Sequence, residues 1–89
     1  MAEIALERQP ALRSVYRLQW EDAQQAWVLL YPEGMVKLNA TAAEILRRCD
    51  GSASVDELIN GLERDYAPAQ LRDDVCLFLE GAHGRGWIA

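Results

Sequence analysis

The hydrophobic and polar positions of residues 26–51 predict two short strands and a helix in close succession. Trp27–Tyr31 is a continuous run of aromatic and branched apolar residues, which is typical of a strand. Pro32 and Gly34 then indicate a turn, because proline presets φ at its second position and glycine accepts the positive φ often needed at its exit. Met35–Leu38 is therefore expected to return as a second strand.

A helix is predicted over residues 41–50, directly after that strand. Either Asn39 or Thr41 is expected to cap it, and Thr41 with Glu44 matches the capping-box pattern T-A-A-E. Gly51 stands where a left-handed residue ends a helix. One face of this helix carries apolar residues at the spacing i, i+3, i+4, i+7, namely Ala42, Ile45, Leu46 and Cys49.

The chain ahead of this segment predicts another strand and an N-terminal arm. Residues 14–20 alternate between apolar and polar positions, as a half-buried strand does. Residues 26–31 are apolar on both faces, and a strand of that kind is covered on both. Residues 1–13 show no sustained period, so we expect an arm ahead of a single domain over residues 14–89. The second cover would be this arm or another subunit, which suggests a homodimer.

Two more helices are predicted, over residues 54–66 and 68–82. Ser54 opens a second capping box, S-V-D-E. Pro68 suits the first position of a helix, where its missing N–H costs nothing. Leu77 lies off the main apolar stripe of the last helix. Three strands followed by three helices make an α+β fold that resembles a winged helix-turn-helix, with a three-stranded antiparallel sheet.

Size and charge exclude several classes of protein. A chain of 89 residues is one domain, and an apolar fraction of 51% is enough for a globular core. The net charge of −5 argues against a nucleic-acid partner, because phosphate binding needs a basic face. The longest apolar run is too short to span a bilayer, and the N-terminus lacks the layout of a signal peptide. We therefore expect a cytoplasmic protein without a membrane partner.

No catalytic or metal-binding constellation stands out in the sequence. His83 is the only histidine, and at a helix end its interaction with the helix dipole is the simpler interpretation. Cys49 and Cys76 are far apart in the chain and are interpreted as small buried apolar residues. Asp73 and Asp74 suit the first turn of a helix. We expect no enzyme activity, no cofactor and no metal site.

Binding remains, and the residues alone leave three kinds of protein open. These are a peptide-binding module that uses a sheet edge, a winged-helix nucleic-acid binder, and an obligate dimer with a structural role. Charge disfavours the second, because the predicted last helix carries Arg72 together with several carboxylates. Arg47 and Arg48 are expected to be solvated, with contact to an acidic peptide or partner as the alternative.

Long stretches of the chain resemble the PqqD family of pyrroloquinoline quinone biosynthesis. They are RLQWEDAQQAWVLL, YPEGMVKLNATAAEILRRCDG and SVDELINGLERDY, and the resemblance runs from about Leu12 to Ile88. It implies a non-catalytic peptide chaperone of winged-helix type, a recognition element for precursor peptides. Such a protein binds the precursor peptide PqqA and presents it to the radical SAM enzyme PqqE. The alternatives within the pathway are a structural dimeric accessory protein and a quinone binder that uses Trp27 or Trp87.

The resemblance also implies where the peptide lies. It would be held as an added strand beside the third strand, in a groove floored by the last helix, a mode of binding called β-augmentation. The site residues implied in this way are Met35, Val36, Lys37, Leu38, Arg72, Asp74, Val75, Leu77 and Phe78.

Overall fold

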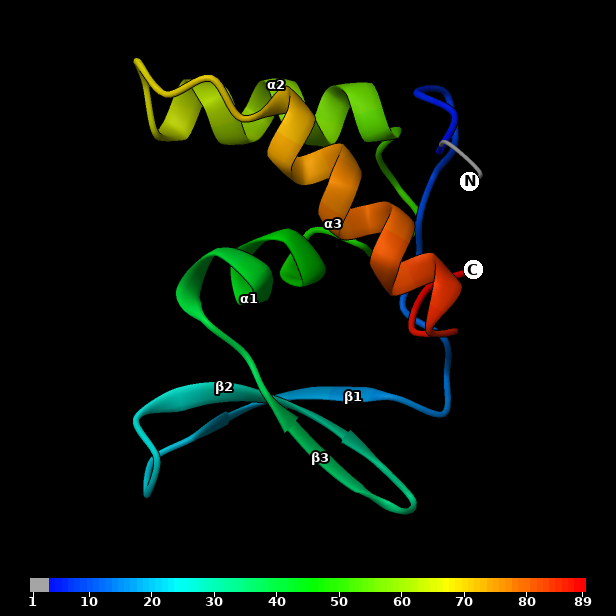
Figure 1. The fold of residues 1–89 in the computed structure, drawn as a ribbon, viewed down its shortest axis with the longest axis vertical. Coiled ribbons are helices and arrows are strands. Elements are labelled where there is room, and N and C mark those ends of the chain that lie inside the picture. The colour runs from blue at the N-terminus through cyan, green and yellow to red at the C-terminus, as the bar shows by residue number, and fades with distance from the viewer. Residues whose placement is uncertain (1–3) are drawn as a thin grey trace.

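The structure is a computed structural model, which describes residues 4–89 as three strands followed by three helices (Figure 1). The elements are β1 (Arg17–Glu21), β2 (Ala26–Tyr31), β3 (Gly34–Lys37), α1 (Ala40–Arg47), α2 (Val55–Asp65) and α3 (Arg72–Gly84). The helices gather on one side of the sheet, and α3 descends from the level of α2 toward it (Figure 1). The predicted α+β architecture is confirmed.

The sheet is antiparallel, with β2 in the centre and β3 at one edge. Tyr31 pairs with Gly34, which leaves the predicted two-residue turn at Pro32-Glu33. β1 begins later than residue 14, because the chain first makes a turn in which the Tyr16 N–H donates to the Arg13 carbonyl at 3.0 Å. That turn sets the direction in which β1 enters the sheet.

The core lies between the sheet and the helices, and Leu29 of β2 is fully buried in it. Val28 is also fully buried, although it lies on the opposite face of the sheet. It stands directly between Gln19 and Lys37, its partners on the two neighbouring strands. The core residues are Leu29, Leu38, Ala42, Ala43, Ile45, Leu46, Cys49, Val55, Leu58, Ile59, Leu62, Val75, Leu79, Ala82 and Ile88.

Residues 4–13 pack against their own chain along the connection between α1 and α2. The Val55 N–H donates to the Arg8 carbonyl at 2.8 Å, and the Gly51 N–H donates to the Pro10 carbonyl at 3.0 Å. Both features that suggested a second subunit, the two-sided strand and the N-terminal arm, thus have contacts within one chain. The homodimer and the division between residues 13 and 14 stay predictions.

The C-terminal residues pair with this N-terminal segment, as the blue and red ends of the ribbon show (Figure 1). Leu12 forms an isolated β-bridge with Ile88, and the Arg13 N–H donates to the Trp87 carbonyl at 2.9 Å. Ile88 is fully buried in the core. The last residues of the chain therefore close the core where the N-terminal segment leads into the sheet.

The start of α1 differs from the capping box predicted at Thr41. Asn39 is the N-cap, and its side-chain oxygen accepts a hydrogen bond from the Ala42 N–H at 2.7 Å. Glu44 instead contacts arginines at the other end of the helix. The helix also ends at Arg47, before the predicted residue 50, because the chain turns there to meet the N-terminal segment.

α2 follows its local signals. The Glu57 N–H donates to the Ser54 hydroxyl at 3.1 Å, and the Ser54 N–H donates to the Glu57 carboxylate at 2.9 Å. The predicted second capping box is confirmed.

α3 begins at Arg72, so the prediction that Pro68 is its first residue is wrong. Pro68 lies in the turn after α2, where the Ala69 N–H donates to the Tyr66 carbonyl at 3.1 Å. The Leu71 N–H is taken by the Glu63 carboxylate of α2 at 2.8 Å. A side chain from the preceding helix thus fixes where α3 begins.

The two possible caps of α1 give a direct stability test. We expect Asn39→Ala to lower the free energy of unfolding by about 1 kcal/mol, because the Ala42 N–H loses its acceptor. Thr41→Ala, the matched control on the exposed first turn, should be close to neutral. Urea denaturation of both variants measures the difference, and an equal loss in the two would contradict the assignment of Asn39.

Candidate functional site

The hydrogen-bond phase of β3 decides which of its backbone groups face outward. The Leu38 N–H donates to the Trp27 carbonyl at 2.9 Å, so these two residues form a hydrogen-bonded pair. Hydrogen-bonded and non-hydrogen-bonded pairs alternate along an antiparallel ladder. Val36 therefore directs its N–H and C=O toward β2, whereas Met35 and Lys37 direct theirs away from it.

The outward groups make this edge a template for another strand. β3 is the last strand of the sheet formed by the described residues. Met35 and Lys37 are two positions apart, so their donors and acceptors repeat at about 6.8 Å along the edge. An extended chain of any sequence can pair with such a row.

The side chains of β3 give the edge two different faces. Met35, 46% exposed, and Lys37 lie on the face away from the helices. Val36 points to the other face and packs against the core. A strand added here would alternate in the same way, with every second side chain toward the helices.

The α3 residues predicted for the site lie on different sides of the helix. Val75 is a core residue, as is Leu38 at the end of β3, so neither side chain is open to a ligand. Phe78 is partly buried against the core, and Asp74 is exposed one turn before it. Leu77, 66% exposed, is about 160° from the buried Val75 at ~100° per residue.

Arg72 and Leu77 line a hollow that contains no β3 residue. The hollow has a volume of about 500 Å³ and lies between α3 and the N-terminal segment. The structure therefore does not join these two residues to the β3 edge through this hollow. Its lining residues are Ile4, Leu6, Arg72, Asp73, Cys76, Leu77 and Glu80.

A smaller cavity of about 230 Å³ lies where the chain passes from β3 into α1. It joins Ala40 and Thr41 at the start of α1 with Tyr66 and Leu71, which flank the turn before α3. No sequence pattern indicated this cavity, because its walls come from segments far apart in the chain.

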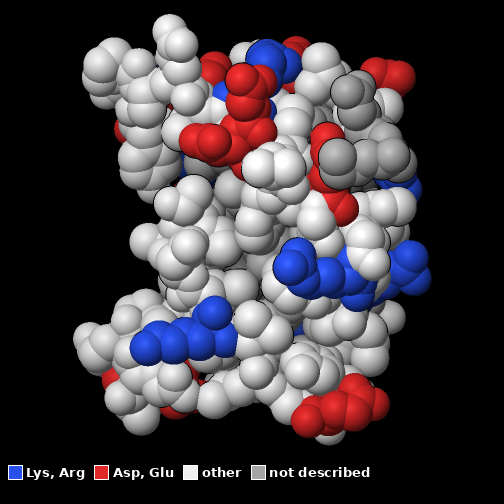
Figure 2. Space-filling view, in the orientation of Figure 1, with Lys and Arg blue, Asp and Glu red and all other residues white. Residues whose placement is uncertain are grey.

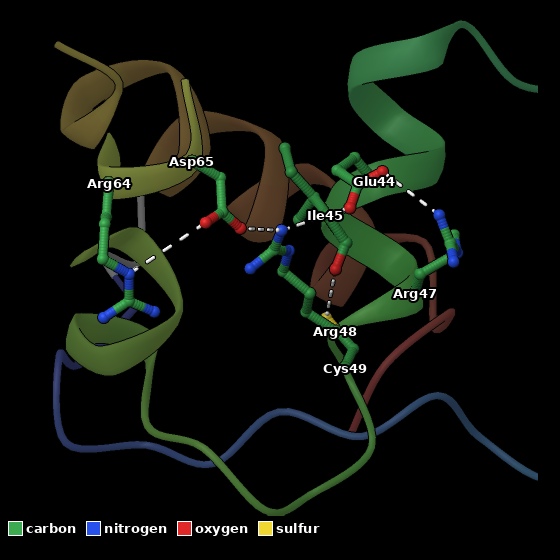
Figure 3. Close-up of polar contacts among 7 residues, drawn as sticks. All are labelled: Glu44, Ile45, Arg47, Arg48, Cys49, Arg64 and Asp65. Atoms are coloured by element: carbon green, nitrogen blue, oxygen red, sulfur yellow. Dashed lines mark hydrogen bonds and ion pairs between the residues drawn. The ribbon is translucent and has the colours of Figure 1, made fainter. Parts of the chain in front are cut away.

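Arg48 connects α1 to α2 (Figure 3). Its guanidinium donates to Asp65 at 2.8 Å and to Glu44 at 3.2 Å. Gly61 permits this approach, since a Cβ there would lie 3.3 Å from the Arg48 Nη1 atom. Arg48 is thus only partly solvated: its side chain is 28% exposed, and the hydrogen bond to Asp65 is the main cause of its raised pKa.

The Arg48–Asp65 contact predicts how stability depends on pH. The hydrogen bond from Arg48 lowers the pKa of Asp65 in the folded state. The stabilisation is therefore present above the pKa of the unfolded chain and is lost as pH falls through the folded pKa. Asp65→Asn should be less stable than the wild type at neutral pH, and this gap should close in acid.

Thermal unfolding over a series of pH values checks that expectation. Glu33→Gln is the matched control, since Glu33 forms no ion pair within residues 4–89. A gap for Asp65→Asn that stays constant from neutral to acid pH would refute the proposed linkage.

The two tryptophans named as stacking candidates each carry an arginine over the ring. The Arg47 guanidinium lies 5.1 Å from the centroid of Trp27, and that of Arg85 lies 5.4 Å from the centroid of Trp87. Trp20 also meets Trp27 edge-on, with centroids 5.9 Å apart. Each ring is thus engaged within the chain on at least one side.

The residues described by the structure show no other marked chemistry. Within residues 4–89, no three His, Cys, Asp or Glu side chains gather in a way that could hold a metal ion. Over the same range, no helix is long and apolar enough to cross a membrane. Cys49 is buried as predicted, and burial raises the pKa of its thiol to about 12.

Comparison with known proteins gives consistent matches over most of the chain. Residues 26–88 match the family model described as coenzyme PQQ synthesis protein D (PqqD). A protein of Methylococcus capsulatus named PqqA binding protein is 48% identical over 77 residues, which cover 86% of this chain and 83% of that protein. A protein of the same name from Stutzerimonas stutzeri is 45% identical over 89 residues, which cover 99% and 97%.

A solved structure also resembles this fold. It is the solution NMR structure of the PqqD truncation of Methylobacterium extorquens PqqCD. That protein represents a functional, stand-alone recognition element for ribosomally synthesised and post-translationally modified peptides. The TM-score is 0.71 at 27% sequence identity, and the match covers 90% of this chain and 87% of that one.

Proposed function

This chain belongs to the PqqD family, and from that membership we propose that it binds the precursor peptide PqqA along the β3 edge. The names of the relatives from Methylococcus and Stutzerimonas, PqqA binding proteins, support the choice of ligand. The description of the Methylobacterium structure as a peptide recognition element supports the class of function. In this proposal the protein is no enzyme: it holds PqqA and presents it to the radical SAM enzyme PqqE.

The observation that carries the proposal is the outward direction of the backbone groups of Met35 and Lys37. A peptide strand on this edge would exchange hydrogen bonds with both residues. Each such bond contributes only about 0.5–1.5 kcal/mol net. The backbone thus provides part of the affinity, and selection among peptides depends on side-chain contacts.

The two faces of the edge define those contacts. Peptide residues paired with Met35 and Lys37 would project beside them, away from the helices, where Lys37 favours an acidic neighbour. The residue between them would project toward the helices, beside Val36. The cavity at the start of α1 lies beyond Lys37 and offers space for an apolar side chain.

An N-methyl scan of PqqA tests the mode of binding. Each synthetic PqqA peptide carries one N-methylated backbone amide, which removes one donor, and calorimetry gives its affinity for the unmodified protein. Strand pairing predicts that affinity falls at alternate positions only, because every second amide faces the edge. A loss at nearly every interior position would indicate a bound helix, because all its amides beyond the first turn are bonded within the helix, and an unchanged affinity throughout would refute β-augmentation.

A further inference from the structure

The hollow beside α3 has an apolar floor that the fold leaves open. Leu77 is 66% exposed and Leu6 is 39% exposed, and both line it together with Ile4 and Cys76. Leu77 is the most exposed of the large hydrophobic side chains within residues 4–89. Single exposed leucines are ordinary, but this one lies in a concave site with other apolar groups.

The rim of the hollow is acidic. Asp73 and Glu80 line it, and neither belongs to an ion pair of the described chain. The only cation in the lining, Arg72, is already engaged by Asp56 at 2.9 Å. Figure 2 shows acidic side chains grouped over the upper part of this face, where α3 begins. The hollow therefore combines an apolar floor with negative charge that has no partner within residues 4–89.

We propose that this hollow is a docking site for a segment of a second protein, which places an apolar side chain on Leu77 and flanking Lys or Arg residues against Asp73 and Glu80. Charge complementarity selects this partner: an acidic rim repels acidic segments and attracts basic ones. The apolar floor selects against a purely polar basic segment, because such a segment would have to place charged or polar groups on Leu77 without a hydrogen-bonding partner.

This docking site is separate from the peptide edge. No β3 residue lines the hollow, and no lining residue belongs to the edge. The two sites therefore share no residue. The hollow is small compared with a standard protein interface, so contact through it alone is weak and sensitive to salt.

Cys76 provides a reporter inside the hollow. Cys76 is one of the lining residues and is only partly buried. Cys49, the other cysteine of the chain, is 3% exposed and has a pKa raised to about 12 by burial. Because the thiolate is the reactive form, an alkylating reagent should modify Cys76 and spare Cys49.

The test measures the rate of Cys76 alkylation by iodoacetamide in the full chain, with three synthetic helical peptides as probes. One peptide has a leucine stripe flanked by lysines, the second replaces the leucines by serine, and the third replaces the lysines by glutamate. Only the first should slow the alkylation. It should also shift the backbone amide signals of Leu6, Asp73 and Leu77 and leave those of Met35 and Lys37 unchanged.

Variants then separate charge from apolar contact. Glu80→Lys and Leu77→Ser should each lower the affinity for the peptide with leucines and lysines by about tenfold. Glu33→Lys makes the same change of charge in the β2–β3 turn and should leave the affinity unchanged. Glu33 and Leu77 are exposed and Glu80 is only partly buried, so circular dichroism should report an intact fold.

Several outcomes would overturn the proposal. Equal protection by the lysine and glutamate peptides would remove the argument from charge, and protection by none would leave no docking site. Protection that grows with protein concentration alone would show that a second copy of the chain occupies the hollow. Because the peptide edge is measured separately through the Met35 and Lys37 amides, failure here leaves the proposed binding of PqqA untouched.

Discussion

Replacing Lys37 by proline is expected to remove most of the affinity for PqqA while the protein remains folded. The Lys37 N–H faces away from β2, so proline deletes a donor that only an added strand would use. Its ring also blocks regular pairing on that side of the strand. We expect the dissociation constant to rise by at least about tenfold, which corresponds to the loss of one or two hydrogen bonds.

Val36→Pro is the matched control for this change. The Val36 N–H faces β2, so proline there removes a bond inside the sheet and should lower the melting temperature. Lys37→Ala keeps the outward N–H and should retain much of the affinity. Calorimetry with PqqA and thermal unfolding are measured for all three variants. A folded Lys37→Pro protein with wild-type affinity would rule out the β3 edge as the binding site for PqqA. A larger loss of stability in Lys37→Pro than in Val36→Pro would show that the N–H of Lys37, and not that of Val36, is bonded to β2.

Ile88→Ala is expected to lower the free energy of unfolding by about 2–5 kcal/mol, a large effect for a residue next to the C-terminus. Ile88 is fully buried, and its backbone pairs with Leu12. Truncation leaves a cavity where the two terminal segments meet the helices. For a chain this short, such a loss is a large part of the total stability.

Two controls grade this effect. Ile88→Val removes one methylene and should cost about 0.5–1.5 kcal/mol. Leu77→Ala removes a side chain of the same size from a position that is 66% exposed, and should be close to neutral. Urea denaturation gives all three values, and a neutral Ile88→Ala would show that the C-terminal segment does not close the core.

The parts of the fold that were predictable depend on short-range interactions. Ser54 caps α2 through a partner three residues away, and the Pro32-Glu33 turn pairs strands that adjoin it. The start of α3 was not predictable in this way, because Glu63 of the preceding helix fixes it. The same holds for Arg48, whose partner Asp65 is 17 residues away.

The candidate site shows the same limit. Sequence and family resemblance indicated β3, but the outward groups at Met35 and Lys37 follow from the strand order and register. Leu77 was assigned to the same site, and no periodicity in the N-terminal residues indicated that Leu6 would lie beside it. Apolar residues at helical spacing identify a face, and only the packing shows what lies opposite.

Amide hydrogen exchange of the chain with and without PqqA tests the central claim most directly. The Val36 N–H is bonded inside the sheet, so its exchange should be slow in both states. The N–H groups of Met35 and Lys37 face solvent in the free protein and should exchange quickly. If PqqA adds a strand to β3, both should become protected on binding while Val36 changes little. If PqqA binds and the Met35 and Lys37 amides still exchange as fast as in the free protein, the peptide does not pair with this edge.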